Sequence, residues 1–169
     1  MSNADLQQLL DKQAIEEVLI DYCRCLDEMA LDDLAALFTD DCAVSYGPGP
    51  ALESQGRADL AKSLQRMWRW SRTSHHLANA RIWLDGDQAR AVSYVEAWHE
   101  RPDGSSATIW GQYRDRLVRQ AGTWLIAERR MEMNGSDAGF TVNIYPLDRR
   151  PPPDGWTAPD IDHPPQGEK

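Results

Sequence analysis

Two adjacent histidines, His75 and His76, lie in the segment Thr73–Asn79, immediately before a predicted β-hairpin. Histidine is the side chain whose ordinary pKa lies close to neutral pH, so it can accept and release a proton there. A predicted helix earlier in the chain carries Asp27, a carboxylate able to hold one imidazole in place. A histidine oriented by a carboxylate is a common general base that needs no cofactor. A lone histidine at a strand edge is more often a surface residue or a core residue with satisfied hydrogen bonds.

The elements that must position these residues follow from hydrophobic periodicity, which is helical in the first part of the chain and has a period of two after His75. We expect helices over Asp5–Leu26 (with Asp5 as its cap), Leu31–Phe38 and Gly56–Trp70, a short β-segment at Cys42–Tyr46, and strands over Ala80–Leu84, Gln88–Glu100, Thr108–Arg119 and Trp124–Asn134. Helices followed by an antiparallel meander predict an α+β fold in which the helices cover one face of a curved sheet. Residues 1–145 form the predicted domain, and residues 146–169 form a Pro-rich tail without a core of its own.

One face of the second predicted strand is made of small residues, which would leave room in front of the sheet. That row consists of Ala89, Ala91, Ser93, Val95, Ala97 and His99. The strands that follow place Tyr113, Arg129 and Met131 on corresponding faces, and Trp68 is a candidate for binding an apolar ring. This mixture of small, aromatic, sulfur-containing and polar side chains is more typical of a pocket lining than of a tight core.

The composition excludes several classes of function. A net charge of −9 argues against binding to nucleic acid or to an anionic membrane, because both partners would be repelled. Three cysteines without CxxC spacing are consistent with reduced thiols in a cytoplasmic protein. The chain has no metal-ligand spacing, GxGxxG turn or phosphate loop, so we expect neither a metal nor an organic cofactor.

Several segments together resemble the SnoaL-like family of the nuclear transport factor 2-like superfamily. They are Ala14–Val18, Tyr22 with Asp27, Leu34–Asp41, Ser74–Asn79, Leu84–Ala89 and Trp124–Arg129. The resemblance implies a cone built from a curved antiparallel sheet with helices closing its wide end. Within the superfamily the chain is most similar to cofactor-free lyases: scytalone dehydratase, hexachlorocyclohexane dehydrochlorinase and bile-acid 7α-dehydratase.

The resemblance also implies roles for individual residues. His75 falls on the general base of those lyases and Asp27 on the carboxylate that orients it. Tyr22 and Arg129 fall on further catalytic positions, and Tyr46 and His99 on residues of the scytalone enzyme's pocket. A small hydrophobic substrate and a homo-oligomer, with a trimer favoured over a dimer, are implied as well. We find no secure counterpart for the sheet aspartate of the polyketide cyclases.

Three classes of function remain open at this stage. The first is a dehydratase-type lyase, with His75 as base, Asp27 as its orienter, a tyrosine as acid and Arg129 stabilising developing negative charge. The second is an isomerase or a C–C lyase, such as a deformylating enzyme for lignin-derived diaryl compounds, using the same pair. The third is a non-catalytic ligand-binding module or the small subunit of an aromatic-ring dioxygenase, which would require a large iron-binding partner.

Overall fold

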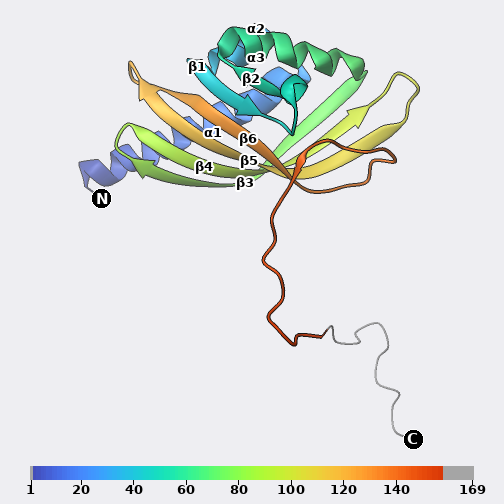
Figure 1. Cartoon of the computed structure of the whole chain (residues 1–169). Coiled ribbons are helices and arrows are strands. Elements are labelled where there is room, and N and C mark those ends of the chain that lie inside the picture. Colours follow the sequence, from blue (N-terminus) through green and yellow to red (C-terminus); the bar gives the residue numbers. More distant parts are fainter. Residues whose placement is uncertain (1, 158–169) are drawn as a thin grey trace, which may run out of the picture.

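In the computed structural model, which describes residues 2–157, helices lie over the concave side of a curved, unclosed sheet (Figure 1). The elements are α1 (Asn3–Asp27), α2 (Leu31–Ala36), β1 (Phe38–Ser45), η1 (Pro50–Leu52), β2 (Glu53–Gln55), α3 (Arg57–Leu64), η2 (Gln65–Arg69), β3 (Arg72–Asp85), β4 (Gln88–Glu100), β5 (Ser106–Gln120), β6 (Thr123–Ser136) and β7 (Tyr145–Pro146). The α+β cone expected from the sequence is confirmed.

The sheet has the strand order β2-β1-β6-β5-β4-β3, and β7 pairs with β6 at Glu132 and Met133, beyond the residues of β6 that pair with β1. The predicted antiparallel meander is confirmed for β3 to β6. β1, however, lies parallel to β6, which hairpin connections do not predict. It also begins at Phe38, where the sequence favoured the end of a helix. The chain therefore passes from the helices into the sheet at this residue.

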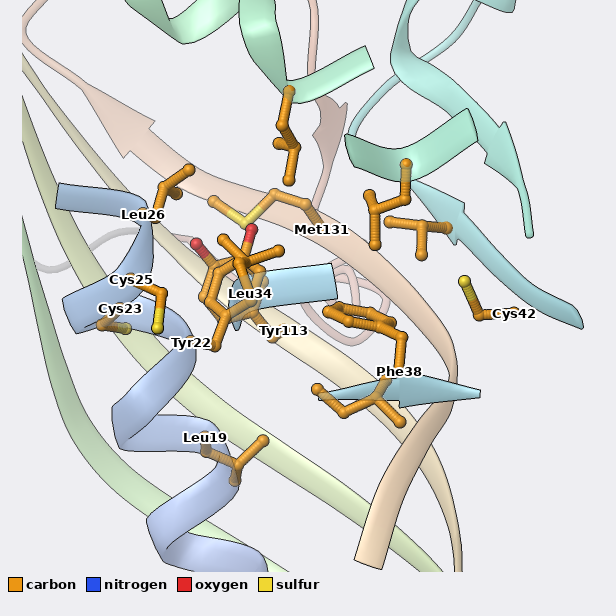
Figure 2. Packing of buried hydrophobic residues seen from close by; sticks show 14 of the residues in the cluster. Leu19, Tyr22, Cys23, Cys25, Leu26, Leu34, Phe38, Cys42, Tyr113 and Met131 are labelled. Atoms are coloured by element: carbon orange, nitrogen blue, oxygen red, sulfur yellow. The ribbon is translucent and has the colours of Figure 1, made fainter. Parts of the chain in front are cut away.

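Helix α1 begins at a capping box and ends beside β3. Ser2 is the N-cap and Asp5 occupies the third helical position, so the expectation that Asp5 itself caps the helix was wrong. The buried face of α1 repeats at helical spacing and packs on the sheet, as Figure 2 shows for part of the cluster; its members are Ile15, Leu19, Tyr22 and Leu26. The helix stops after Asp27, where Met29 adopts a left-handed backbone with φ of 56°.

Strand β3 is longer than its sequence pattern indicated, because it begins at Arg72 rather than at Ala80. The histidines therefore lie within a paired strand, with His75 opposite Ala97 of β4. The alternation is interrupted between Leu77 and Ala80, where the register with β4 shifts. The first half of the strand was therefore missed in the sequence, because a period-two pattern is broken where a bulge inserts an extra residue.

A second irregularity lies in β6, where Leu117 of β5 pairs with Ile126 while Arg116 pairs with Glu128. Ala127 is the extra residue, so the pattern changes face there. Ile126 is fully buried, whereas Leu125 is only half-buried, so a simple alternation that puts Leu125 on the face of Arg129 and Met131 is wrong for this strand. On the C-terminal side of the bulge, Arg129 and Met131 point inward as expected.

The predicted tail starts within the ordered sheet. Tyr145 and Pro146 form β7, and the backbone N–H of Leu147 donates to the carbonyl of Met133. The segment before β7 returns over the concave side and contacts the η1 region, where Asn143 donates to the carbonyl of Pro48. The last part of the predicted tail, residues 158–169, lies outside the described residues.

Candidate active site

A cavity of about 490 Å³ opens between α1, η2, the inner face of β3 to β6 and the segment 140–144. This volume suits a small organic ligand, since such pockets are typically some 300–1,000 Å³ in size. Of the row of small residues expected to leave space in front of β4, only Ala97 lines the cavity, together with His99 at the end of the row. The expectation was wrong for the rest of the row, because Ala89, Ala91, Ser93 and Val95 are buried in the packed interior.

His75 and Asp27 form a hydrogen-bonded pair at the wall of this cavity. The imidazole Nδ1 lies 2.6 Å from Asp27 Oδ1, and the backbone N–H of His75 donates to Asp27 Oδ2 at 2.8 Å. Thr73 adds a third donor to the same carboxylate, at 2.8 Å from Oδ1. Asp27 is the last residue of α1, and its carboxylate lies beside β3. There it accepts hydrogen bonds from Thr73 and His75, which share one face of the strand.

The protonation states follow from this geometry. Burial by itself would raise the pKa of Asp27, but the hydrogen bonds from His75 and Thr73 outweigh it and lower the pKa below its ordinary value. An ionised carboxylate only accepts hydrogen bonds, so Nδ1 of His75 carries the proton shared with Asp27. In the neutral imidazole the free lone pair is then on Nε2, which is the atom that a general base needs. His75 lines the cavity with a side chain only 4% exposed.

His99 stands next to His75, with ring centroids 5.2 Å apart and planes nearly perpendicular. Its Nδ1 lies 3.1 Å from the carbonyl oxygen of Ala97 and so donates to it. Burial, followed by the charge of His75, lowers the pKa of His99 to about 4. His99 is therefore neutral at pH 7, with Nε2 available as an acceptor. Trp70 also packs against the imidazole of His99, at 5.0 Å between ring centroids.

Tyr22 and Tyr46 bring two phenols together in the cavity wall. Their hydroxyl oxygens are 2.6 Å apart, so one donates to the other and the second hydroxyl keeps its own proton free. Burial raises the pKa of Tyr22 above its ordinary value, against the opposing charge of Arg129, and raises the pKa of Tyr46 well above it. Both are phenols, not phenolates, at neutral pH. The pair can donate one hydrogen bond or one proton to a ligand oxygen.

Arg129 lies behind this wall and is fully buried in an ion pair with Asp115. Its Nε and Nη2 contact the two carboxylate oxygens at 2.7 and 2.8 Å, and both side chains are 0% exposed. The guanidinium lies 4.0 Å from the ring centroid of Tyr22 and 4.3 Å from that of Tyr113, which lie against each other in Figure 2. Burial alone would lower the pKa of Arg129, but the charge of Asp115 reverses this and raises it.

The structure brings most of the predicted site residues to one cavity. Those in its wall are His75, Tyr22, Tyr46, His99, Tyr113, Ala97 and Met131, with Asp27 directly behind His75. Three predicted residues are elsewhere. Val95 is buried in the core, Arg129 is held by Asp115, and Trp68 is 62% exposed on the outer side of η2. The η2 turn has a tighter 3-10 period than the helix predicted there, which turns Trp68 outward and Met67 inward.

Other lining residues were not selected from the sequence as site residues. Arg66, Arg69 and Arg101 project from η2 and the β4–β5 turn, and residues 140–144 form one side of the cavity. Irregular segments such as 140–144 carry no periodicity, so nothing in the local pattern indicates which way they fold. Trp70 is in the cavity wall, whereas Trp110 is 41% exposed on the outer face of β5.

Within residues 2–157 no group of three His, Cys, Asp or Glu side chains is placed to hold a metal ion. The three cysteines are buried and unpaired, and burial raises the pKa of each thiol. In the same part of the chain, no helix has the length and apolarity needed to cross a membrane.

Comparison with known proteins places this geometry in context. The SnoaL-like domain family matches residues 7–130. A crystal structure from Novosphingobium aromaticivorans DSM 12444, provisionally assigned as a scytalone dehydratase, is 30% identical with a TM-score of 0.79, covering 85% of this chain and 97% of that one. The fold is also similar to a hexachlorocyclohexane dehydrochlorinase from Novosphingobium barchaimii LL02, at 20% identity and a TM-score of 0.71, covering 85% and 99% of the two chains. An uncharacterised protein of Mycobacterium tuberculosis strain H37Rv is 26% identical over 134 residues, 76% of this chain and 88% of the relative.

Proposed function

Since the chain belongs to the SnoaL-like domain family, we propose that it is a cofactor-independent lyase acting on a hydrophobic aromatic or polycyclic small molecule. The observation that carries the proposal is the His75–Asp27 pair at the wall of a cavity. The pair supplies a general base with a defined tautomer, and the neighbouring phenols supply an acid, so an elimination can proceed without further groups.

The proposed reaction is the removal of water across a carbon–carbon bond. Nε2 of His75 accepts a proton from carbon, and the electrons of that C–H bond form the new C=C bond. The C–O bond on the adjacent carbon breaks, and the departing oxygen takes a proton from the Tyr22–Tyr46 pair and leaves as water. The proton on His75 then returns to the phenol. Asp27 stabilises the imidazolium that forms in the first step, because its carboxylate is already hydrogen bonded to Nδ1.

The walls of the cavity favour an apolar substrate. Ile109, Met131 and Ala107 line it from the sheet, and Trp70 and Phe140 contribute aromatic surface that suits flat rings. Elimination next to an aromatic ring yields a conjugated alkene, which absorbs in the near ultraviolet. This property makes the reaction visible in a screen of secondary aryl and polycyclic alcohols.

The test is a comparison of His75→Ala with His76→Ala in that screen. His76 is the adjacent residue of β3, but it is exposed on the opposite side, where Ser74 hydrogen bonds to its ring. We expect the absorbance rise to disappear in His75→Ala and to persist in His76→Ala, with both variants folded by circular dichroism. Near wild-type turnover in His75→Ala would falsify the proposed base.

The mass of the product distinguishes related chemistry in the same cavity. Loss of one water molecule supports the lyase proposed here. A product of unchanged mass would indicate an isomerase, and release of formaldehyde would indicate a C–C lyase using the same pair. Tight binding without turnover, or a co-purifying large iron-containing chain, would instead support the non-catalytic roles.

A further inference from the structure

The cavity wall carries an unbalanced positive charge. Arg66, Arg69 and Arg101 line it, and no aspartate or glutamate among residues 2–157 does. This is unexpected in a chain with 27 acidic and 18 basic residues, where carboxylates are the more abundant partners. The nearest functional carboxylate, Asp27, lies behind His75 and is occupied by its three hydrogen bonds.

Most other arginines of the described chain have acidic partners. Those in ion pairs are Arg24, Arg57, Arg72, Arg114, Arg116, Arg119, Arg129 and Arg130. Within residues 2–157 no carboxylate lies within 4 Å of Arg66, Arg69 or Arg101. Arg66 donates only to Ser63, through a single nitrogen. The acidic neighbour of Arg101 in the turn, Asp103, hydrogen bonds instead with Ser105.

Two of the three guanidinium groups share one aromatic surface, and the third, that of Arg66, lies 5.0 Å from the ring centroid of Tyr46 in the same cavity wall. Arg69 lies 5.0 Å and Arg101 5.7 Å from the ring centroid of Trp70, and Arg101 is also 4.1 Å from that of Phe140. Partial burial, and then the charges of Arg66 and Arg101, lower the pKa of Arg69. Like charges held together in this way repel one another, and a bound anion would relieve that repulsion.

We propose that Arg66, Arg69 and Arg101 form a binding site for an anionic group, a carboxylate or a phosphate ester, on the substrate of this cavity. The inference rests on the proposed function and narrows its substrate class to aromatic molecules bearing an acidic group. The planar, multiply donating guanidinium suits such oxyanions. Arg129, which the sequence favoured for stabilising developing negative charge, does not line the cavity and is held by two hydrogen bonds to Asp115.

The arrangement orients a substrate relative to the base. Trp70 contacts both the arginine site and His99, and His99 in turn contacts His75. Arg69 is exposed and marks the open end of the cavity. When the anionic group of a substrate binds at the arginines, the apolar part of that substrate extends inward along these rings. The reacting carbon then faces the His75–Asp27 pair. The arginines are thus binding and specificity residues, and they take no part in proton transfer.

The test is binding of probes that match in shape and differ in charge. Isothermal titration calorimetry is carried out with 2-naphthoate, 2-naphthyl phosphate and the uncharged 2-naphthylmethanol, at low and high salt. We expect both anions to bind wild-type protein at least about tenfold more tightly than the alcohol, since hydrogen bonds to charged groups contribute more than neutral ones. The preference should shrink at high salt, and the tighter anion identifies the group that the site accommodates best.

Arg69→Gln, Arg101→Gln and the double variant should lose this preference while still binding the alcohol. Arg81→Gln is the matched control, because Arg81 stacks on Trp83 at 5.7 Å on β3, outside the cavity lining. Equal affinity for acid and alcohol in wild type, unchanged preference in the double variant, or no binding of the anions at millimolar concentration would each overturn the inference. Binding requires no turnover. An intact anion preference with an inactive protein therefore counts against the lyase proposal alone.

Discussion

Asp27 contacts His75 twice, once at the imidazole Nδ1 and once at the backbone N–H, at 2.6 and 2.8 Å. The imidazole ring and the backbone of His75 are thus both held by hydrogen bonds to one carboxylate at the end of α1. This double contact fixes where the imidazole sits and which of its nitrogens is free, two requirements for a general base.

The first prediction concerns this contact. Asp27→Asn should reduce turnover by orders of magnitude, because the amide no longer compels Nδ1 to carry the proton and cannot stabilise the imidazolium. In ¹⁵N-labelled protein, NMR should show Nε2 of His75 unprotonated in wild type and a changed tautomer mixture in the variant. The control is Asp21→Asn on the same helix, because the Asp21 carboxylate is half-exposed beside Arg24. This variant should change neither the turnover nor the tautomer of His75. An unchanged tautomer and rate in Asp27→Asn would contradict the assigned role.

The second prediction concerns the buried pair of Asp115 and Arg129. Asp115→Asn leaves an unpaired buried charge, and we expect a loss of about 3–5 kcal/mol in the free energy of unfolding, measured with urea. Glu128→Gln is the control, since Glu128 pairs with Arg116 on the exposed face of the same sheet and such pairs contribute at most about 1 kcal/mol. Equal losses in the two variants would show that the buried pair is not a structural anchor for Tyr22 and Tyr113.

The third prediction concerns pH. The unfolded chain binds a proton at His99 near pH 6.5, whereas the folded pKa is about 4, so acid favours the unfolded state between these values. His99 should therefore remove up to roughly 3 kcal/mol of stability as the pH falls from 6.5 to 4. His99→Asn keeps a donor for the Ala97 carbonyl but does not titrate, so this part of the acid sensitivity should vanish.

Urea unfolding at pH 7 and at pH 4.5 measures the effect on wild type and variant. The lowered pKa of Asp27 changes the free energy of unfolding only below about pH 4, its ordinary pKa, so it does not contribute to the difference between pH 7 and pH 4.5. His76→Asn, at an exposed position on β3, serves as the control and should retain the wild-type acid sensitivity. Equal acid sensitivity in His99→Asn and wild type would contradict the assignment.

The fourth prediction concerns assembly. We expect a homo-oligomer, because the outer face of the sheet exposes large aromatic side chains, with Tyr94 at 45% and Trp110 at 41%. A trimer is favoured over a dimer, as the family resemblance implies. Light scattering at micromolar concentration should give three times the chain mass of 19.1 kDa. Trp110→Arg should shift the mass toward that of one chain if this face is the interface. A wild-type mass of 19.1 kDa would exclude an oligomer.

The sequence by itself determined the features that depend on short-range order. Helical spacing located the buried face of α1 from Ile15 to Leu26, although it also predicted burial of Leu9 and Leu10, which are exposed. Strict alternation placed β4 at its observed bounds with Ala97 and His99 facing inward. The residue types near Asp27 and His75, together with the family resemblance, were sufficient to select the pair before its geometry was known. These inferences hold because periodicity and turn chemistry act over a few residues.

Only the tertiary structure decided the features that depend on register and on irregular segments. The bulge at Ala127 and the pairing of β5 with β6 bring Asp115 opposite Arg129, and this occupies a guanidinium that sequence reasoning assigned to catalysis. The arginines of the cavity come from η2 and a β-turn, and the segment 140–144 that faces them has no periodic pattern. Charge balance inside a cavity depends on which distant side chains meet there. Local sequence does not specify these long-range contacts, so it could not predict that Arg66, Arg69 and Arg101 line one cavity.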